Sequence, residues 1–386
     1  MPPVVYAGIE STFTGALVPV RQLEDYLDIM DPDDYPLLQA VGLNSYDTTI
    51  TQTTYEWQID YLIPSQSGIQ VDPGAVGAVW LVTAAQAGYF NLHDVCLCGT
   101  ELVRVLTIDT VANTITVERS FAGTAAAGHV ALTPIYRLGP ARPEGSSPGW
   151  AQQTLAVHPF NYTQIWDGVA EVTNTEEATK QYAPDDLMGM RIDRAMKQLY
   201  VVMEQALFSG IRFQPAANTG RSTGGLNQFI LDNDALGGAP LTLADIEDAL
   251  QNVALRAGMS NVPLDLWCNA WPLRKLSAFG LGSIRTDRTE TTVGNVITQF
   301  LTNFGTVRTH FDRLVNPAGL YLLNMDRIQI GPLQGRGFAS YSQDIGTTLT
   351  DSKMERIIGE YGFVIKGEDG TNQGVNVRIT GFSLVA

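Results

Sequence analysis

A long β-ribbon, interrupted by an inserted block and followed by one long helix, is the feature that most limits the folds open to this chain. The ribbon runs out at Thr53–Pro64 and returns at Gln153–Thr173, and the helical stretch Pro184–Phe208 follows. We do not expect a ribbon of this length to bury both of its faces within one globule, so its partner is expected on another molecule. The pattern therefore indicates an assembly subunit rather than a solitary enzyme.

Large apolar side chains alternate with mostly polar ones along the outgoing arm of the ribbon, as expected for a strand with one covered face. The returning arm is also aromatic and β-branched, with a turn expected at Asp167-Gly168. Trp57 and Trp166 lie on opposite arms, where they either pack within the sheet or stand exposed as interface anchors, and we favour the interface. The candidate interface residues are Tyr55, Trp57, Ile59, Tyr61, Tyr162 and Trp166.

Five short β-like runs make up the inserted block between Ala78 and Arg137, and turn-forming residues separate them. Strands at this spacing predict a small closed or half-closed β-barrel. The runs are Ala78–Thr83, Asp94–Cys98, Glu101–Ile108, Asn113–Glu118 and His129–Tyr136.

Cys96 and Cys98 lie close to His93, and His129 follows later in the block. Thiolate and imidazole bind zinc, but structural zinc takes four ligands and no second cysteine pair is near. Residues two apart on a strand point to one face, so we interpret the cysteines as a core pair. With Cys268 the chain has three cysteines, which is no disulfide framework and favours a reducing compartment.

Apolar residues recur at i, i+3 and i+4 through the helical stretch, over about seven turns at 3.6 residues per turn. Asp185 or Asp186 can cap its first turn, and Gly210 is the expected stop. A helix of this length is expected to cross a whole domain.

The rest of the chain mixes helices with strands, which predicts an α/β or α+β arrangement. The glycine-rich loop Asn218–Leu226 lacks the lysine and following Ser or Thr of a phosphate-binding loop, and we interpret it as a hinge. Lys353–Lys366 and Gly374–Val385 are expected to form a terminal hairpin. The other expected elements are helices Leu243–Ala257 and Pro272–Phe279 and strands Leu264–Asn269, Val296–Phe300, Thr306–Phe311 and Gly319–Leu323.

The net charge of −16 is concentrated at the start, because residues 1–60 hold ten acids and one base, Arg21. An acidic surface repels phosphate, which argues against direct gripping of nucleic acid. This acidic arm is either a solvated segment or one that docks on basic patches of a neighbour. Charged residues make up only 17% of the chain, against about 25% in typical globular domains, which indicates a surface covered by neighbours.

No catalytic, cofactor or metal site is expected. The four histidines have no partnered spacing, and His310 with Asp312 lacks a nucleophile elbow to complete a triad. The acidic run Asp31–Asp34 lacks the calcium-loop pattern. The start of the chain lacks the basic and apolar regions of a signal peptide, and no apolar run approaches the ~18 residues of a membrane span.

The order of several weak motifs gives the chain a resemblance to a known family. The segments that carry it are Ile165–Leu187, Glu204–Gly210, Gly224–Ile230, Asn303–Val315 and Gly359–Phe382, with Asp94–Gly128 similar to insertions in some members. In this order, and over nearly the whole chain, they resemble the major capsid protein of tailed bacteriophages, whose fold is named after the Hong Kong phage. No single motif among them is diagnostic.

The resemblance implies an α+β capsid fold with a long spine helix. By this resemblance, the expected domains are an N-terminal arm (1–50), an extended loop (51–75 and 139–173), a β-barrel insertion (76–138), a peripheral domain with the spine helix (174–210 and 346–386) and an axial domain (211–345).

The resemblance also implies a structural subunit that assembles as pentamers and hexamers into an icosahedral virion capsid in the bacterial host cytoplasm and encloses double-stranded DNA without specific binding. Portal, scaffolding and decoration proteins are further candidate partners, and no cofactor or membrane is implied. Some relatives crosslink through a lysine on the extended loop, which contains none here. The alternatives are a shell protein of a cellular protein compartment and, less favoured, an enzyme with a β-barrel appendage, which would need convergent titratable groups.

Overall fold

A computed structural model of the chain describes residues 35–60, 63–74, 76–84, 86–145, 156–179, 186–216, 220–257, 263–279, 299–302, 305–343, 351–368 and 374–384. They fall into two compact units, one within Gln58–Val157, called the β-block below, and one within Met1–Trp57 and His158–Ala386, called the main unit. The helix expected at Arg21–Met30 lies outside the described residues. None of the helices within these ranges is long and apolar enough to cross a membrane.

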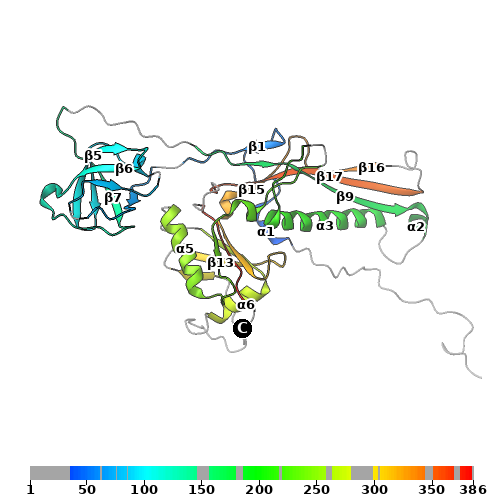
Figure 1. Cartoon of the computed structure of the whole chain (residues 1–386). Helices are drawn as coiled ribbons and strands as arrows, with labels where there is room; N and C mark the ends of the chain where they lie inside the picture. The colour runs from blue at the N-terminus through cyan, green and yellow to red at the C-terminus, as the bar shows by residue number, and fades with distance from the viewer. Residues whose placement is uncertain are drawn as a thin grey trace, which may run out of the picture. The chain divides into compact units, whose positions relative to one another are not determined.

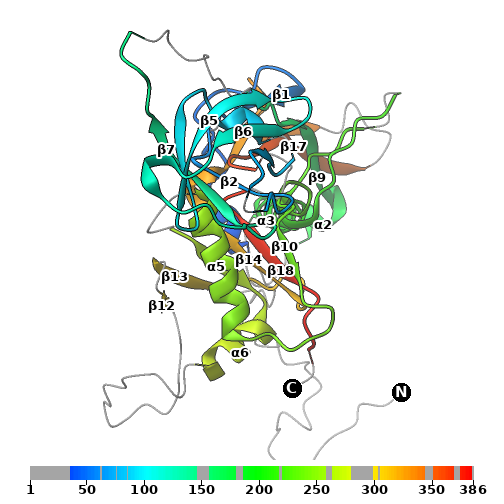
Figure 2. The ribbon, with the colours of Figure 1, turned by 60° about the vertical axis from the view of Figure 1, so that its left-hand side comes forward.

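The β-block is a six-stranded sheet in which every neighbouring pair is antiparallel (Figures 1 and 2). A bridge between Ile69 and Val82 joins its two outer strands, with Gln70 N donating to Leu81 O at 2.8 Å and Thr83 N to Gly68 O at 2.9 Å. The strands in spatial order are β2 (Gln66–Gly68), β7 (Pro134–Pro140), β4 (Asp94–Cys98), β5 (Glu101–Asp109), β6 (Thr114–Glu118) and β3 (Val79–Leu81). Short 3-10 turns lie at Ala87–Tyr89 and Phe121–Gly123.

One face of these strands forms the core of the β-block. Cys96 and Cys98 are fully buried in it beside Trp80, Ile115 and Ile135, which confirms the interpretation of the cysteines as a core pair. Burial raises the pKa of the Cys96 thiol to about 12, so this thiol stays protonated at neutral pH.

The β-block differs from the prediction at both of its ends. Strand β2 lies before the expected start at Val76, and its three residues are too few to give an alternation signal. The last strand begins at Pro134 rather than at His129. Residues 129–133 do not continue this strand, because Leu132 has a left-handed φ of 69° and the His129 side chain is turned to Glu101.

The main unit contains one sheet built around its longest strand. Strand β17 (Ser352–Ile365) pairs antiparallel with β15 (Ile328–Pro332), β16 (Ala339–Gln343) and β9 (Gln164–Thr173). The β9 register runs from Thr173 opposite Ser352 to Gln164 opposite Tyr361. A two-stranded sheet of β1 (Thr54–Glu56) and β8 (Phe160–Tyr162) also belongs to this unit.

Helix α3 (Leu187–Ser209) covers one face of this sheet (Figure 1). It begins as expected, with the Asp186 side chain accepting from Gly189 N at 2.8 Å, and it ends at Gly210. Gly168 of β9 faces this helix, where an added Cβ would lie 2.9 Å from Leu199. The short helices α1 (Pro36–Val41) and α2 (Asn174–Ala178) complete this part.

A second sheet of the main unit has mixed strand directions and is covered by helices. Apolar residues of α5 (Leu243–Ala257), including Leu250 and Val253, form its core with Leu266 and Leu322. The strands in spatial order are β10 (Asn233–Ala235), β18 (Val377–Thr380), β14 (Gly319–Leu323), β11 (Asp265–Cys268), β13 (Gly305–Phe311) and β12 (Gln299–Thr302). The accompanying helices are α4 (Leu226–Phe229) and α6 (Ala270–Phe279), with a 3-10 turn at Met325–Arg327.

Two sequence predictions in the main unit are wrong. The terminal hairpin does not form, because β17 pairs with β9, β15 and β16, whereas β18 lies between β14 and β10 in the other sheet. The expected turn at Asp167-Gly168 lies inside β9, where Asp167 accepts from Arg356 Nε at 2.8 Å. In both cases partners far along the sequence override a local turn signal.

Candidate assembly interface

Three of the candidate interface residues lie in the core of the main unit. Tyr55 and Trp57 are 7% exposed and Trp166 is 4% exposed. The Tyr55 hydroxyl donates to Phe363 O at 2.8 Å, and the Trp57 and Phe229 rings are 5.5 Å apart. The expectation that the two tryptophans stand exposed on a projecting ribbon is therefore wrong for this chain.

The other candidates remain accessible or lie outside the described ranges. Ile59 is half-buried and forms a bridge with Val157 within the β-block. Tyr162 is half-buried on β8, and its ring meets that of Phe160 edge-on at 5.7 Å. Tyr61 lies outside the residues that the structure describes.

A surface that the sequence analysis missed is the face of the β9–β17–β16 sheet opposite α3. Trp166, Ala170 and Val172 of β9 are buried toward the helix, whereas the alternate residues Ile165 and Val169 are 48% and 51% exposed. The alternation of Ile165, Asp167 and Val169 was the available signal, but the expected turn at Asp167-Gly168 concealed it.

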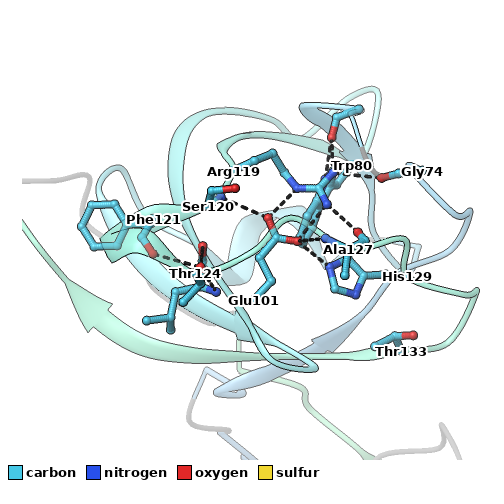
Figure 3. Close-up of polar contacts among 12 residues, drawn as sticks. Gly74, Trp80, Glu101, Arg119, Ser120, Phe121, Thr124, Ala127, His129 and Thr133 are labelled. Atoms are coloured by element: carbon cyan, nitrogen blue, oxygen red, sulfur yellow. Dashed lines mark hydrogen bonds and ion pairs between the residues drawn. The ribbon is translucent and has the colours of Figure 1, made fainter.

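One end of the β-block is held by a buried carboxylate (Figure 3). Glu101 is fully buried and accepts from Arg119 Nε at 2.7 Å and from Arg119 Nη2 at 2.8 Å. His129 Nε2 lies 2.9 Å from the same carboxylate, and the backbone N–H groups of Ser120 and Ala127 donate to it at 3.1 and 3.2 Å. The carboxylate therefore fixes the loop between β6 and β7.

Arg119 extends this network to the loop between β2 and β3. Its guanidinium donates to Gly74 O at 3.0 Å and to Gly77 O at 2.9 Å, and it lies 5.2 Å from the centre of the Trp80 ring. Burial alone would raise the pKa of Glu101, but hydrogen bonds from Arg119 and His129 outweigh it and lower the pKa to about 2. Two loops are thus held by one ion pair.

These loops present apolar side chains to solvent. The residues are Val71, Val76, Val130 and Leu132, which are 56%, 91%, 72% and 80% exposed. The buried polar network therefore serves as structural support for an exposed apolar end.

A second buried carboxyl group holds the start of the described chain against α3. Leu37 N and Leu38 N donate to the Glu204 side chain at 3.2 and 3.0 Å. Burial, followed by the hydrogen bond with Asp312, raises the pKa of Glu204 above its ordinary value. Helix α1 is thereby fixed on the α3 side of the sheet.

The remaining sequence candidates take part in packing. His310 stacks on Trp267 with ring centres 4.5 Å apart. In the glycine-rich loop, Gly225 N donates to Gly210 O at 2.8 Å, and an added Cβ on Gly225 would lie 2.4 Å from Ala206 O. This loop therefore packs its backbone on the end of α3. In the described ranges, no three or more His, Cys, Asp or Glu side chains are grouped as metal ligands.

One comparison with known proteins matches a family over nearly the whole chain. A family model described as the SU10 major capsid protein matches residues 6–371. The capsid of an empty GTA particle, computed with C5 symmetry, shares the fold, with a TM-score of 0.55 and 8% identity over 97% of this chain and 100% of that chain. A structure from Microbacterium phage Oxtober96 has a TM-score of 0.54 and 12% identity over 96% of this chain and 98% of that chain.

A weaker likeness is to the holo-SrpI encapsulin complex from Synechococcus elongatus PCC 7942, with a TM-score of 0.41 and 10% identity over 59% of this chain and 77% of that chain. Among curated proteins, none has a matching sequence. The family match spans nearly the whole chain, and the α+β architecture agrees with it. The chain therefore belongs to the SU10 major capsid protein family and is a structural subunit of a phage virion, not an enzyme.

Proposed function

We propose that this capsid protein forms pentamers and hexamers that close into an icosahedral shell around double-stranded DNA. The observation that carries the proposal is the family match over residues 6–371. The capsid of a GTA particle shares this fold. The net charge of −16 supports a shell that encloses DNA without gripping it.

The described strands support the proposed domains and adjust their limits. The six strands of the insertion run from Gln66 to Pro140, so we place this domain there rather than at Val76–Leu138, and we infer a closed barrel from the bridge between its outer strands. Strands β15 and β16 pair with β17, so they belong with the peripheral domain. Strand β18 pairs with β14, so it joins the axial domain.

Contacts between subunits are proposed for the segments 51–65 and 141–163, which connect the insertion to the main unit and correspond to the extended loop. Ile59, Tyr61 and Tyr162 are the candidate contact residues on them. Portal, scaffolding and decoration proteins are further proposed partners, by analogy with the family.

Purified protein is expected to assemble into closed particles whose capsomers have five- and six-fold symmetry. Electron microscopy of the protein, or of particles from infected cells, tests this directly. A stable monomer at high concentration, with no particle under any assembly condition, would contradict the proposed function.

The shell is expected to be held together without covalent crosslinks. A lysine–asparagine bond of the kind some relatives form needs a lysine on the extended loop, and residues 51–75 and 139–173 contain none. Boiled mature particles should give one band near 41.9 kDa on a denaturing gel. A ladder of oligomers that resists boiling and reductant would refute this prediction.

A further inference from the structure

Two fully buried carboxyl groups meet inside the main unit. Glu204 lies in the last two turns of α3, Asp312 directly follows β13 of the second sheet, and both are 0% exposed. A hydrogen bond joins the two side chains. Asp312 N donates to Cys268 O at 2.9 Å, and Asp312 Oδ1 accepts from Leu314 N at 2.8 Å, so this acid is fixed on the second sheet. The carboxyl pair therefore joins α3 to that sheet.

Helix α1 is the third element at this pair, and it lies against α3 (Figure 1). Leu37 N donates to Glu204 Oε1 at 3.2 Å and Leu38 N to Glu204 Oε2 at 3.0 Å, so both oxygens of the carboxyl group hold the first turn of α1. The ring of Tyr35, the residue before the helix, lies 5.2 Å from that of Tyr200 on α3. Helix α1 has only six residues, too few to be stable alone, so its position depends on these contacts.

A shared proton is needed to hold the two carboxyl groups together. An ionised carboxylate can only accept hydrogen bonds, so the bond between Glu204 and Asp312 requires a proton on one of them. Two negative charges in contact at a buried site would also repel each other, which favours the same state. The pair therefore holds α1, α3 and the second sheet together only while it keeps this proton.

The charged side chains described on the strands around the pair are exposed or have other partners. Arg308 and Arg313 are exposed, Arg378 donates to Asn227 Oδ1 at 3.1 Å, His310 lies 3.7 Å from Asp265, and Glu360 pairs with Arg221 and Arg336. Phenols and a thiol also lie on the surrounding elements and cannot become cations, namely Tyr35, Tyr200, Tyr321 and Cys268. The charged group that acts on Glu204 among the described residues is thus Asp312, a second acid.

We propose that the proton shared by Glu204 and Asp312 is a latch that keeps α1 docked on the main unit, and that alkaline pH opens this latch and releases α1. The latch acts within a single subunit, so the proposal does not depend on the assembly function above. It gives the carboxyl pair a conformational role, because Leu37 and Leu38 are the attachment point of the N-terminal segment on α3.

The direction of the pH effect follows from proton linkage. Release of α1 uncovers Glu204, which then ionises near its ordinary pKa of 4.5, whereas burial and the bond with Asp312 keep the pKa above that value in the docked state. The released state therefore binds fewer protons above pH 4.5. Docking weakens by up to about tenfold for each further pH unit until the docked pair itself ionises. The latch is tight in acid and loosens as pH rises.

A spin label on Gln39→Cys reports the release of α1. Gln39 is an exposed residue of this helix, and the native cysteines are buried, so the label reacts mainly with the introduced thiol. Electron paramagnetic resonance measures its mobility in the full-length, unassembled subunit from neutral pH to about 9.5, below the ordinary tyrosine pKa of about 10. The ratio of mobile to docked label is expected to rise severalfold per pH unit. An unchanged ratio over this range would overturn the proposal.

Asp312→Asn separates the latch from general unfolding in alkali. The introduced amide keeps an oxygen for Leu314 N and offers Glu204 a donor that needs no shared proton. Ionised Glu204 can then accept from this amide and from both N–H groups of α1. The label should therefore stay docked over the whole pH range. The same pH dependence in this variant and in the unmodified subunit would overturn the proposal. A label on Gln251→Cys, exposed on α5, should be immobile throughout and shows that the subunit remains folded.

Glu204→Gln is a second variant, which decides the question if Asp312→Asn fails to fold. Its amide is neutral at every pH and can still donate to Asp312, but it accepts only one of the two α1 N–H groups. The label should therefore be more mobile at neutral pH, and its mobility should no longer depend on pH. The matched control is Asp248→Asn, which removes an exposed acid of α5 and should leave the pH dependence unchanged. Release that still depends on pH in Glu204→Gln would assign the titration to another group and overturn the latch.

Discussion

Glu101→Gln is expected to destabilise the β-block by about 3–5 kcal/mol, because removing one partner of a buried ion pair leaves the other charge uncompensated. Arg119 is only 10% exposed and would retain its positive charge without the carboxylate that accepts from it twice. Hydrogen exchange of the block's amides, followed with chemical denaturation of the unassembled subunit, measures the loss.

Glu118→Gln is the matched control for this prediction. Glu118 pairs with Arg104 at 2.6 Å in the same block, but the two side chains are 46% and 27% exposed. Exposed ion pairs contribute about 0–1 kcal/mol, so the control should have little effect. Similar losses of stability for both variants would show that burial does not determine how much the Glu101–Arg119 ion pair stabilises the β-block.

The same pair makes the β-block sensitive to acid. The pKa of Glu101 is lowered from 4.5 to about 2 in the folded chain, so the unfolded chain binds a proton there first as pH falls. The contribution of Glu101 to stability is therefore complete above pH 4.5 and is lost progressively toward pH 2. Glu101→Gln should remove this part of the pH dependence.

The sequence predicted the elements of the β-block better than the network that holds it. Strand β4 agrees with its predicted limits, and the inward pair Cys96 and Cys98 follows from alternation alone. Glu101 and Arg119 carried no signal, because eighteen residues separate them and only the folded strands bring them together. Buried polar networks depend on such contacts and leave no local pattern.

Trp166→Ala is expected to lower the unfolding free energy of the unassembled subunit by about 3–5 kcal/mol, the usual cost of truncating a buried large aromatic side chain. Trp166 of β9 is 4% exposed, and its ring lies 6.3 Å from that of Phe363 in the core of the main unit. Denaturant unfolding followed by circular dichroism provides the measurement.

Ile165→Ala is the control, because it truncates the adjacent residue of the same strand on the opposite face, where the side chain is 48% exposed. Surface substitutions usually change stability by no more than about 0.5 kcal/mol. If Trp166→Ala blocked assembly while leaving the subunit as stable as the control, the interface interpretation from the sequence would be correct instead.

Helices were predicted well in the main unit, and strand partners were not. Helices α3 and α5 agree closely with the periodicity because a helix satisfies its backbone hydrogen bonds locally. Strand β17 was predicted as a strand, but its predicted pairing partner was β18, the next strand in the sequence. Alternation reveals that a strand has a covered face, but it does not identify the partner that covers it.

The pairing of β9 with β17 also fixes an order of events during folding. Asp167 and Arg356, which join these strands, are 189 residues apart, whereas all strands of the β-block lie within one continuous stretch. Closing a long loop costs more entropy and slows folding, so the block is expected to fold while the ribosome is still synthesising the main unit. The sheet that holds α3 must wait for β17, and a truncated chain that lacks this strand cannot complete it. Chains that end before β17 are therefore expected to lack a folded main unit.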